Sequence, residues 1–457
     1  MPPKRRRKAP PDQLSPRPTS PSPAPDRDES LSEEDSEVSP AQHSTPPFYN
    51  TTFSTHRVSP LYLGSGKEES LTTDRLQLLS QHLRDRLVGD VVRGVEVGNG
   101  EDGIVGKAGA LEAVEMTWVG VPEVLGISRG VLETLGEEDG MGRGLLGKRA
   151  LHILLQYEMA SCSGFMLPPL ISAEEEEELA SNTAKTRFMV GGGDNNLDWE
   201  RAVNPSHFLA LPLLLLRMPA PLKTIVGDFL SETFDCRVSP LRLGTRSLVR
   251  SWEAWIRSAG LPSRGPLAKD VVLSLGFHLP YDTVPVPNAP PGEEVAAEDH
   301  PQPLGLKTID VIIPATELQK FAAAGTRLVK THSKLISSAA GWEWENDLQQ
   351  RRKVAGRLGE EGWEWHTAKP DDAGSQPFTE ALACYLKQHL GLNLFHPGVR
   401  IVKIACGGFA MSEMRLKLFA PSRDAEAGTE GEGLSLLGQR GAALELLEGL
   451  VAKARVQ

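Results

Sequence analysis

A motif of eight residues occurs twice in this chain, and its repetition restricts the folds that the chain can adopt. The first copy, RVSPLYLG, spans residues 57–64 and the second, RVSPLRLG, spans residues 237–244, so seven of the eight positions are identical. Each copy follows β-branched and aromatic residues and breaks at a Ser-Pro pair, as a strand that runs into a turn does. Two related halves that begin with the same unit explain this repetition better than a chance echo does.

The residues after each copy support this interpretation, because both segments carry an apolar face at helical spacing. Residues 72–88 have Thr72 or Thr73 as a candidate N-cap, and residues 245–260 have Gly260 as a candidate C-cap. The first apolar face consists of Leu76, Leu79, Leu83 and Leu87. The second consists of Leu248, Trp252, Trp255 and Ile256. The two copies therefore share both the residue motif and the predicted order of strand, turn and helix.

Further strands and helices follow without the regular alternation of a parallel α/β sheet, which indicates an α+β fold. Strand patterns occur at residues 113–121, 149–162, 269–280, 306–314, 398–407 and 412–420. Helical spacing occurs at residues 219–234, 315–325, 378–391 and 433–457. In the last strand, Met414, Leu416 and Leu418 share one face.

We expect two related halves of mixed or antiparallel sheet with packed helices. The N-terminal half would span residues 48–233 and the C-terminal half residues 234–420, with a linker and a C-terminal helix over residues 421–457. Residues 1–47 hold 12 of the 35 prolines and few large apolar residues, so they cannot bury enough surface to offset the entropy of ordering. They are expected to form a disordered tail.

The tail contains a short basic run and several serines that a kinase could modify. The run consists of Lys4, Arg5, Arg6, Arg7 and Lys8, and it is typical of a nuclear import signal, the alternative being a merely solvated basic end. Ser-Pro or Thr-Pro pairs begin at residues 15, 20, 22, 39 and 45, and acidic residues follow Ser30 and Ser32. Phosphorylation at these residues would add negative charge to the tail, which could regulate the docking of a partner. Ser-Pro and Thr-Pro pairs are, however, also common in any segment rich in proline and serine.

Composition argues against several classes of protein. The strongest apolar run, residues 208–222, carries Arg217 and internal prolines and is shorter than the roughly 20 residues that a bilayer needs, so no membrane contact is expected. The N-terminus has no apolar signal segment, so secretion is not expected. The cysteines are scattered without a C-x-x-C pair, which indicates a reducing compartment and neither zinc nor disulfides; they are Cys162, Cys236, Cys384 and Cys406. A net charge of −11 makes a poor phosphate-binding surface unless the basic residues gather on one face.

No motif points to catalysis or to a cofactor. Residues 98–103 (GNGEDG) fit a dinucleotide-binding pattern but precede a poor helix, and residues 142–148 (GRGLLGK) lack the hydroxyl that a phosphate loop needs next, because Arg149 follows. Trp-Glu-Trp occurs at residues 342–344 and 363–365 around a basic stretch that includes residues 351–357. Nucleic-acid contact is one interpretation of this stretch; the preferred one is strand ends whose rings cover a core edge.

Four segments resemble the centromere protein L family in its fungal form. They are PPFYNTTFSTHRVSPLYLG (46–64), FDCRVSPLRLGTRSLVRSWEAW (234–255), LKTIDVIIP (306–314) and GVRIVKIACGGFAMSEMRLKLF (398–419). The resemblance covers residues 48 to about 420, and the loop at 281–305, the glutamates at 174–178 and the segment 433–457 lack an aligned counterpart.

The resemblance implies a non-enzymatic α+β subunit of the inner kinetochore, located at the centromere in the nucleus and without a cofactor. It also implies a partner of the centromere protein N family, joined through strands of the C-terminal half, and an indirect or shared contact with centromeric DNA or the nucleosome. On this sequence the seam falls at residues 399–406 and 413–419, where apolar strands flank Gly407-Gly408 and suit edge addition, the alternative being that both strands are interior. The candidate partner-binding residues are Val399, Ile401, Lys403, Ala405, Glu413, Met414, Arg415, Leu416, Lys417 and Leu418.

Two other classes of function remain open at this point. A nucleic-acid-binding nuclear protein would use the basic stretch at residues 351–357 and the Trp-Glu-Trp segments. A nucleotide-binding enzyme would use residues 142–148.

Overall fold

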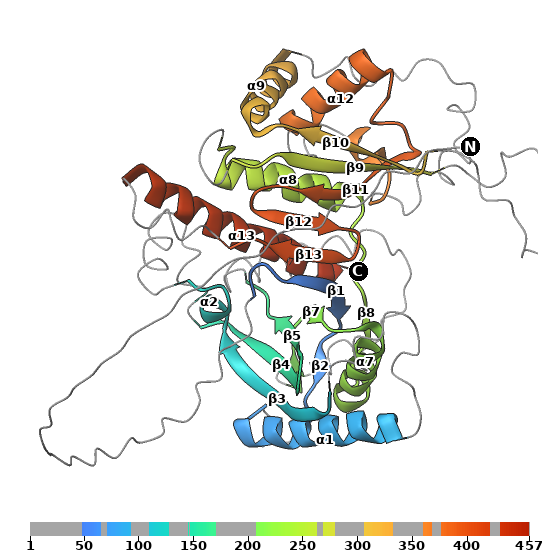
Figure 1. Ribbon diagram of the computed structural model, residues 1–457, viewed down its shortest axis with the longest axis vertical. Helices are drawn as coiled ribbons and strands as arrows, with labels where there is room; N and C mark the ends of the chain where they lie inside the picture. The colour runs from blue at the N-terminus through green and yellow to red at the C-terminus, as the bar shows by residue number, and fades with distance from the viewer. Residues whose placement is uncertain are drawn as a thin grey trace, which may run out of the picture. The chain divides into compact units, whose positions relative to one another are not determined.

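The computed structural model describes residues 48–64, 71–92, 109–127, 145, 147–170, 207–262, 268–278, 306–331, 360–367, 376–420 and 430–456 (Figure 1). The strands are β1 (Thr52–Val58), β2 (Leu61–Tyr62), β3 (Leu111–Gly120), β4 (Arg149–Tyr157), β5 (Ser161–Leu167), β6 (Phe208–Leu209), β7 (Leu213–Arg217), β8 (Val238–Pro240), β9 (Val271–Phe277), β10 (Thr308–Ile313), β11 (Val399–Ala405), β12 (Phe409–Ser412) and β13 (Arg415–Leu418). The helices are α1 (Thr73–Val92), α2 (Val121–Val124), α7 (Ala220–Phe234), α8 (Thr245–Ala259), α9 (Ala315–Thr331), α11 (Glu364–Thr367), α12 (Pro377–Leu390) and α13 (Glu430–Val456).

Eleven of these strands form one sheet, and the predicted α+β class is confirmed. The strand order is β10-β9-β11-β12-β13-β1-β7-β5-β4-β3, with β8 added beside β1, and every pair is antiparallel. In Figure 1 the sheet runs from β10 near the top to β3 near the bottom. β2 and β6 form a separate two-stranded ladder.

The two copies of the repeated motif pair with each other. In the antiparallel pair of β1 and β8, Val58 lies opposite Val238, and these are equivalent residues of the two copies. The hydroxyl of each serine accepts a hydrogen bond from an arginine of the other copy. Ser59 Oγ accepts the backbone N–H of Arg237 at 2.9 Å, and Ser239 Oγ accepts the side-chain Nε–H of Arg57 at 2.8 Å. The copies therefore meet around a local two-fold axis. The predicted order of strand, turn and helix is confirmed in both, since β1 leads to α1 and β8 leads to α8.

Two apolar layers cover the two sides of the sheet. One layer joins α1 and α7 to the strands of the N-terminal half, and it buries the predicted leucine face of α1. The other joins α8, α9, α12 and α13 to the opposite side and extends over strands of both halves. The C-terminal half, β9 to β13, is thus packed with helices on one side only within the described part of the chain. Among the described residues, this asymmetry leaves one side of these strands without a covering helix.

Several sequence predictions need correction. Residues 149–162 form the hairpin β4–β5 instead of one strand, because the chain turns at Glu158-Met159. β12 was not predicted, since four residues are too short for a periodic signal. Trp363 and Trp365 lie at a helical turn, α11, so the predicted strand is wrong there. Both rings are nevertheless buried, as the preferred interpretation expected.

The sheet is continuous across the predicted domain boundary at residues 233 and 234. β1 from the N-terminal half lies between β13 of the C-terminal half and β7, so the two halves share hydrogen bonds in the middle of the sheet. α13 packs against α8 and contributes eight buried side chains to the core. The division into two halves was made from the sequence repeat, and its boundaries stay a prediction. The tail at 1–47 with its basic run, and the segments 98–103, 342–344 and 351–357, lie outside the described residues.

Candidate partner-binding surface

The two strands of the predicted seam lie in the interior of the sheet. β11 pairs with β9 and β12, and β13 pairs with β12 and β1. Their backbone N–H and C=O groups are used on both sides, so a partner strand cannot be added at either one. The expected edge addition at residues 399–406 and 413–419 is therefore wrong for these strands. Contact between their side chains and a partner stays a prediction.

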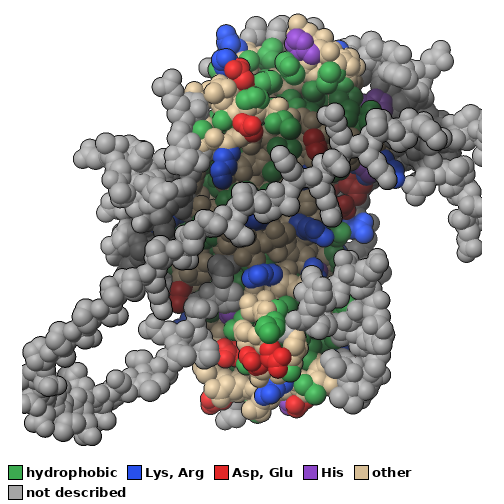
Figure 2. Space-filling view, in the orientation of Figure 1, with side chains coloured by type: hydrophobic (Ala, Val, Ile, Leu, Met, Phe, Trp, Pro, Cys, Tyr) green, Lys and Arg blue, Asp and Glu red, His purple; other side chains and the backbone are tan. Residues whose placement is uncertain are grey.

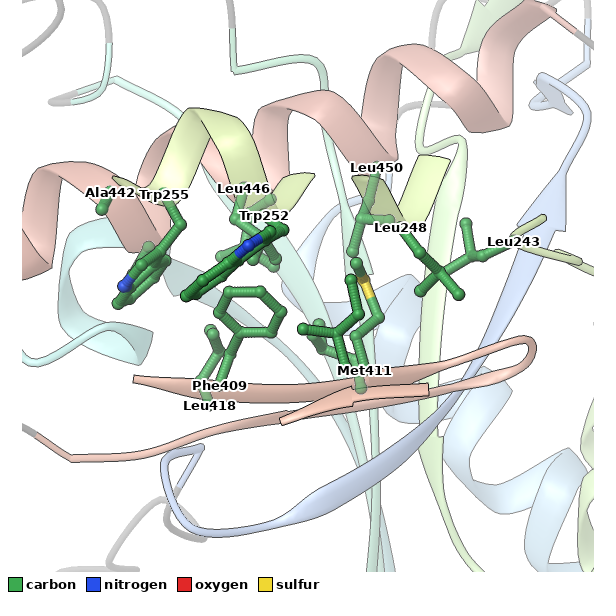
Figure 3. Close-up of a cluster of buried hydrophobic side chains, with 14 of the residues drawn as sticks. Leu243, Leu248, Trp252, Trp255, Phe409, Met411, Leu418, Ala442, Leu446 and Leu450 are labelled. Carbon is green, nitrogen blue, oxygen red and sulfur yellow. The ribbon is translucent and has the colours of Figure 1, made fainter. Parts of the chain in front are cut away.

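Four of the candidate residues point into the core. They are Val399, Ile401, Leu416 and Leu418. Figure 3 shows Leu418 and Phe409 on the strand side of the cluster that faces Trp252 and Trp255 of α8. The ring centroids of Trp255 and Phe409 are 5.2 Å apart. These buried side chains stabilise the fold and are not available to a partner.

The other candidate residues face away from this core or lie in a turn. The outward-facing ones are Lys403, Ala405, Arg415 and Lys417. Glu413 and Met414 form the turn between β12 and β13. The predicted common face of Met414, Leu416 and Leu418 is thus wrong for Met414, whose side chain is 41% exposed because the strand begins only at the next residue.

The outward side of β9 to β13, with the adjoining part of β1, forms a surface that we call the open face. Strand register aligns one row across it: Asp310, Ser274, Lys403, Ser412, Arg415 and Ser54. The next row consists of Ile312, Val272, Ala405, Ala410, Lys417 and Thr52. Most of these side chains are small, so the long cationic ones stand above the sheet. In Figure 2 the middle of the molecule is hollowed, its floor is largely tan, and Lys and Arg side chains lie on it.

Lys417, on the open face, lies close to the ring of Phe419, and Lys269, from the segment before β9, approaches the same ring. The Nζ atoms of Lys417 and Lys269 lie 5.2 Å and 5.8 Å from the ring centroid of Phe419, within the range of a cation–π contact. Asp310, at the β10 end of its row, accepts a hydrogen bond of 2.6 Å from Ser274 Oγ. This carboxylate is therefore held at the margin of the face, away from the lysine pair.

Burial is the main cause of two pKa shifts next to the open face, and nearby cations add to it. Burial and then the charge of Arg415 lower the pKa of Lys223 on α7. Burial and then the charge of Lys223 lower the pKa of His56. Among the described residues, no carboxylate forms an ion pair with Lys403, Arg415 or Lys417. The open face is thus basic in a chain whose net charge is −11.

The free edge of the C-terminal half is β10. The N–H of Phe277 donates to the C=O of Lys307 at 3.1 Å, so the alternation of an antiparallel ladder turns the N–H and C=O groups of Thr308, Asp310 and Ile312 away from β9. No described strand pairs with that side. The side chain of Ile312 is 62% exposed. β10 therefore presents unpaired backbone groups beside an exposed apolar side chain.

The opposite edge of the sheet, β3, is protected. The N–H of Met116 donates to Ser80 Oγ of α1 at 2.9 Å, and the indole N–H of Trp118 donates to the C=O of Leu71 at 2.9 Å. A helix thus occupies part of that edge. Of the two edges, β10 is the one suited to strand addition.

A pocket of about 110 Å³ lies where the strand ends of the C-terminal half meet α8. Its charged side chains are paired: Arg400 with Glu361 at 3.0 Å, Arg242 with Glu413 at 3.9 Å, and Glu360 with Lys453 of α13. Burial and then Arg400 lower the pKa of His278. Because the charges balance, the pocket favours neither an anion nor a cation.

The described residues contain no arrangement typical of catalysis. No group of three or more His, Cys, Asp or Glu side chains among them could hold a metal ion. Burial raises the pKa of Cys236 and Cys406 to about 11, which keeps both thiols protonated and unreactive. Most of the phosphate-loop-like segment 142–148 lies outside the described residues.

The sequence as a whole decides the family. The family model for centromere protein L matches residues 47–455, nearly the whole chain. The chain belongs to the centromere protein L family. No match was found among curated proteins. The family match extends past residue 420 through α13, so the expectation that residues 433–457 have no family counterpart is wrong as far as residue 455.

Membership of the centromere protein L family makes this a protein of the kinetochore and centromere, with a role in chromosome segregation in the nucleus. The family is a structural one, with inner-kinetochore proteins as partners. No helix in the described part of the chain is long and apolar enough to cross a membrane.

Sequence reasoning missed β10 as the edge strand, because strand order depends on pairings between distant segments.

Proposed function

We propose that this protein is a non-catalytic scaffold subunit of the inner kinetochore that pairs with a centromere protein N-type subunit through its C-terminal half. The observation that carries the proposal is the free edge of β10, next to the open face. An added strand would satisfy the outward N–H and C=O groups of Thr308, Asp310 and Ile312. The exposed side chain of Ile312 would give that strand an apolar contact.

The outward-facing candidate residues supply a second contact in this proposal. On the open face, Lys403 lies on β11, next to β9, whereas Arg415 and Lys417 lie on β13, two strands further on. A partner bound at β10 would lie beside this surface. Such a partner and the open face together would form a basic groove. We propose that this groove makes the shared contact with centromeric DNA, because lysine and arginine side chains that form no ion pair with a described residue can neutralise phosphates.

Replacement of Ile312 by proline tests the pairing. Ile312→Pro removes an N–H that points away from β9 and leaves the hydrogen bonds between β9 and β10 intact. We expect affinity for the centromere protein N-type subunit of the same organism to fall by about tenfold or more, since a lost hydrogen bond and a broken register cost about 1.5 kcal/mol. Ile312→Thr keeps the N–H and the β-branch, so it is the matched control and should bind more tightly than the proline variant.

The readouts are titration calorimetry of the complex and circular dichroism of each variant. Full binding by a folded Ile312→Pro variant would move the interface away from β10. Failure of the wild-type chain to bind the subunit at all would reject the pairing itself.

The DNA contact has its own test on the assembled complex. Replacing Lys403, Arg415 and Lys417 together by glutamine should weaken DNA binding and lower the slope of log K against log salt by about 0.9 for each phosphate that is no longer neutralised. Lys320→Gln on α9 removes an exposed cation that pairs with Glu317 and is the control. An unchanged slope in the triple variant would exclude the open face. Strong DNA binding by the chain alone would favour the alternative of an independent nucleic-acid-binding protein.

A further inference from the structure

The place where the two motif copies cross is not used by the proposed pairing. Ser239, in the second copy, lies opposite Arg57 of the first, and its Oγ accepts a hydrogen bond of 2.8 Å from Arg57 Nε. Ser59, the equivalent serine of the first copy, instead accepts the backbone N–H of Arg237. A cationic side chain thus faces one serine and a backbone N–H faces the other.

The sequence after the two serines also differs. Seven Ser-Pro or Thr-Pro pairs occur in the whole chain, and only Ser239 has a basic residue, Arg242, three positions later. Ser59 has Tyr62 at the corresponding position. Proline-directed protein kinases read the proline directly after the acceptor serine and a basic residue at this third position. Ser239 is therefore the one serine with the complete pattern.

The segment around Ser239 is partly exposed. Pro240 is exposed and the side chain of Arg242 is 54% exposed, but Leu241 between them is buried in the core and its N–H donates to the C=O of Thr55 at 3.0 Å. Ser239 itself is half-buried, in a strand of three residues that pairs with β1 alone among the described strands. Phosphorylation therefore requires β8 and Leu241 to separate locally from β1, which costs less than unfolding of the whole chain. A kinase would reach Ser239 through this local opening, and the rest of the fold would stay intact.

We propose that Ser239 is a phosphorylation site for a proline-directed protein kinase and that the guanidinium of Arg57 holds the added phosphate. The γ-phosphoryl group of ATP passes to Ser239 Oγ: the O–P bond to serine forms, the bond to the β-phosphate oxygen breaks, ADP leaves, and the hydroxyl proton goes to the kinase base. The phosphate carries a charge of about −1.5 to −2 and accepts charge-assisted hydrogen bonds. Because Arg57 belongs to β1 and Ser239 to β8, the modification would tie the two motif copies together.

The site is tested on full-length protein treated with a cyclin-dependent kinase and Mg-ATP. The tail residues Ser15, Ser20, Ser22, Ser39 and Thr45 are first changed to alanine, so that peptide mass spectrometry reports on the folded part. We expect one phosphate at Ser239, none after Ser239→Ala, an unchanged rate after Ser59→Ala, and a rate about tenfold lower after Arg242→Ala, the loss of one charged interaction in the kinase site. Phosphate at Ser59 instead, or at Ser239 only in protein unfolded by urea, would overturn the assignment.

The role of Arg57 is tested by the melting temperature before and after phosphorylation. New charge-assisted hydrogen bonds should raise it by roughly 2–5 °C. Arg57→Gln should remove most of this rise while Ser239 is still phosphorylated, and Arg57→Lys should keep part of it. An equal rise in the Arg57→Gln variant, or a lower melting temperature after phosphorylation of the wild type, would show that Arg57 does not hold the phosphate.

Discussion

Glu360 offers the sharpest test of how the C-terminal helix is attached to the core. Its side chain is buried, its Oε1 accepts the N–H groups of Gly244 and Ser247 at 3.1 Å and 3.2 Å, and the Ser247 hydroxyl donates to the same oxygen. Its Oε2 pairs with Lys453 of α13. One carboxylate thus caps α8 and anchors α13. We predict that Glu360→Gln destabilises the protein substantially.

The magnitude follows from what glutamine can replace. The amide oxygen keeps the hydrogen bonds of Oε1, but the amide nitrogen faces the Lys453 ammonium and loses a charge-assisted bond worth about 1.5–3 kcal/mol. The negative charge at the N-terminus of α8 contributes about 0.3–1 kcal/mol more. Together these effects predict a loss of about 2–4 kcal/mol, a large part of the roughly 5–15 kcal/mol by which native proteins are stable.

The assay is urea unfolding followed by tryptophan fluorescence at neutral pH. Lys453→Met alone and combined with Glu360→Gln completes a double-mutant cycle, in which the double variant should lose less than the two single losses added together. Glu317→Gln, at an exposed ion pair, is the control and should change stability by less than about 0.5 kcal/mol. A Glu360→Gln midpoint equal to that of the control, or strict additivity in the cycle, would refute the reasoning.

The same network predicts a pH dependence. Burial alone would raise the pKa of the Glu360 carboxyl, but hydrogen bonds from Lys453 and Ser247 lower it below the ordinary value of 4.5. The unfolded state therefore takes up the proton first as pH falls, so the stabilisation is complete above the ordinary pKa and disappears as pH falls through the lower folded pKa. The difference between wild type and Glu360→Gln should shrink over that range.

Three further predictions concern the core. Gly408→Ala should cost about 1–3 kcal/mol, because its Cβ would overlap the ring of Trp255; thermal denaturation checks it. Leu447→Ala, fully buried on α13, should cost about 2–5 kcal/mol, whereas Leu390→Ala, which is 63% exposed, should cost less than about 0.5 kcal/mol; equal losses in urea would contradict the packing of α13. Burial lowers the pKa of His152 to about 4, so the unfolded state binds its proton first; wild type should therefore lose more stability than His152→Gln between about pH 7 and about pH 5, and parallel curves would contradict this.

Local patterns predicted most helices and strands correctly. The leucine spacing of residues 72–88 recurs as the buried face of α1, and Gly260 ends α8 with a φ of 71° as a C-cap should. These predictions depend on neighbours along the chain, where periodicity and backbone preference act directly. The hairpin at residues 149–167 and the short strand β12 were missed because a turn between two apolar strands leaves little signal.

The candidate surface was predicted only in part. The alternation in residues 413–419 correctly separated Leu416 and Leu418 from Arg415 and Lys417, which decides what is buried and what is exposed. It could not reveal that β13 is interior, because that depends on its pairing with β1, which lies about 360 residues earlier in the chain. The family identity, by contrast, depended on the amino-acid sequence of whole segments, and it was confirmed.

The sequence by itself determined the repeated unit, the helix faces and the family, since each of these is written in short stretches of the chain. Only the tertiary structure decided that the two motif copies cross at Val58 and Val238. It also decided that, within the described part of the chain, β10 is an edge strand and the cations of β11 and β13 share a face that no helix covers. The physical reason is that strand order and register arise from hydrogen bonds and packing between distant segments. A strand carries in its own residues which side is apolar, but not which strands will lie beside it.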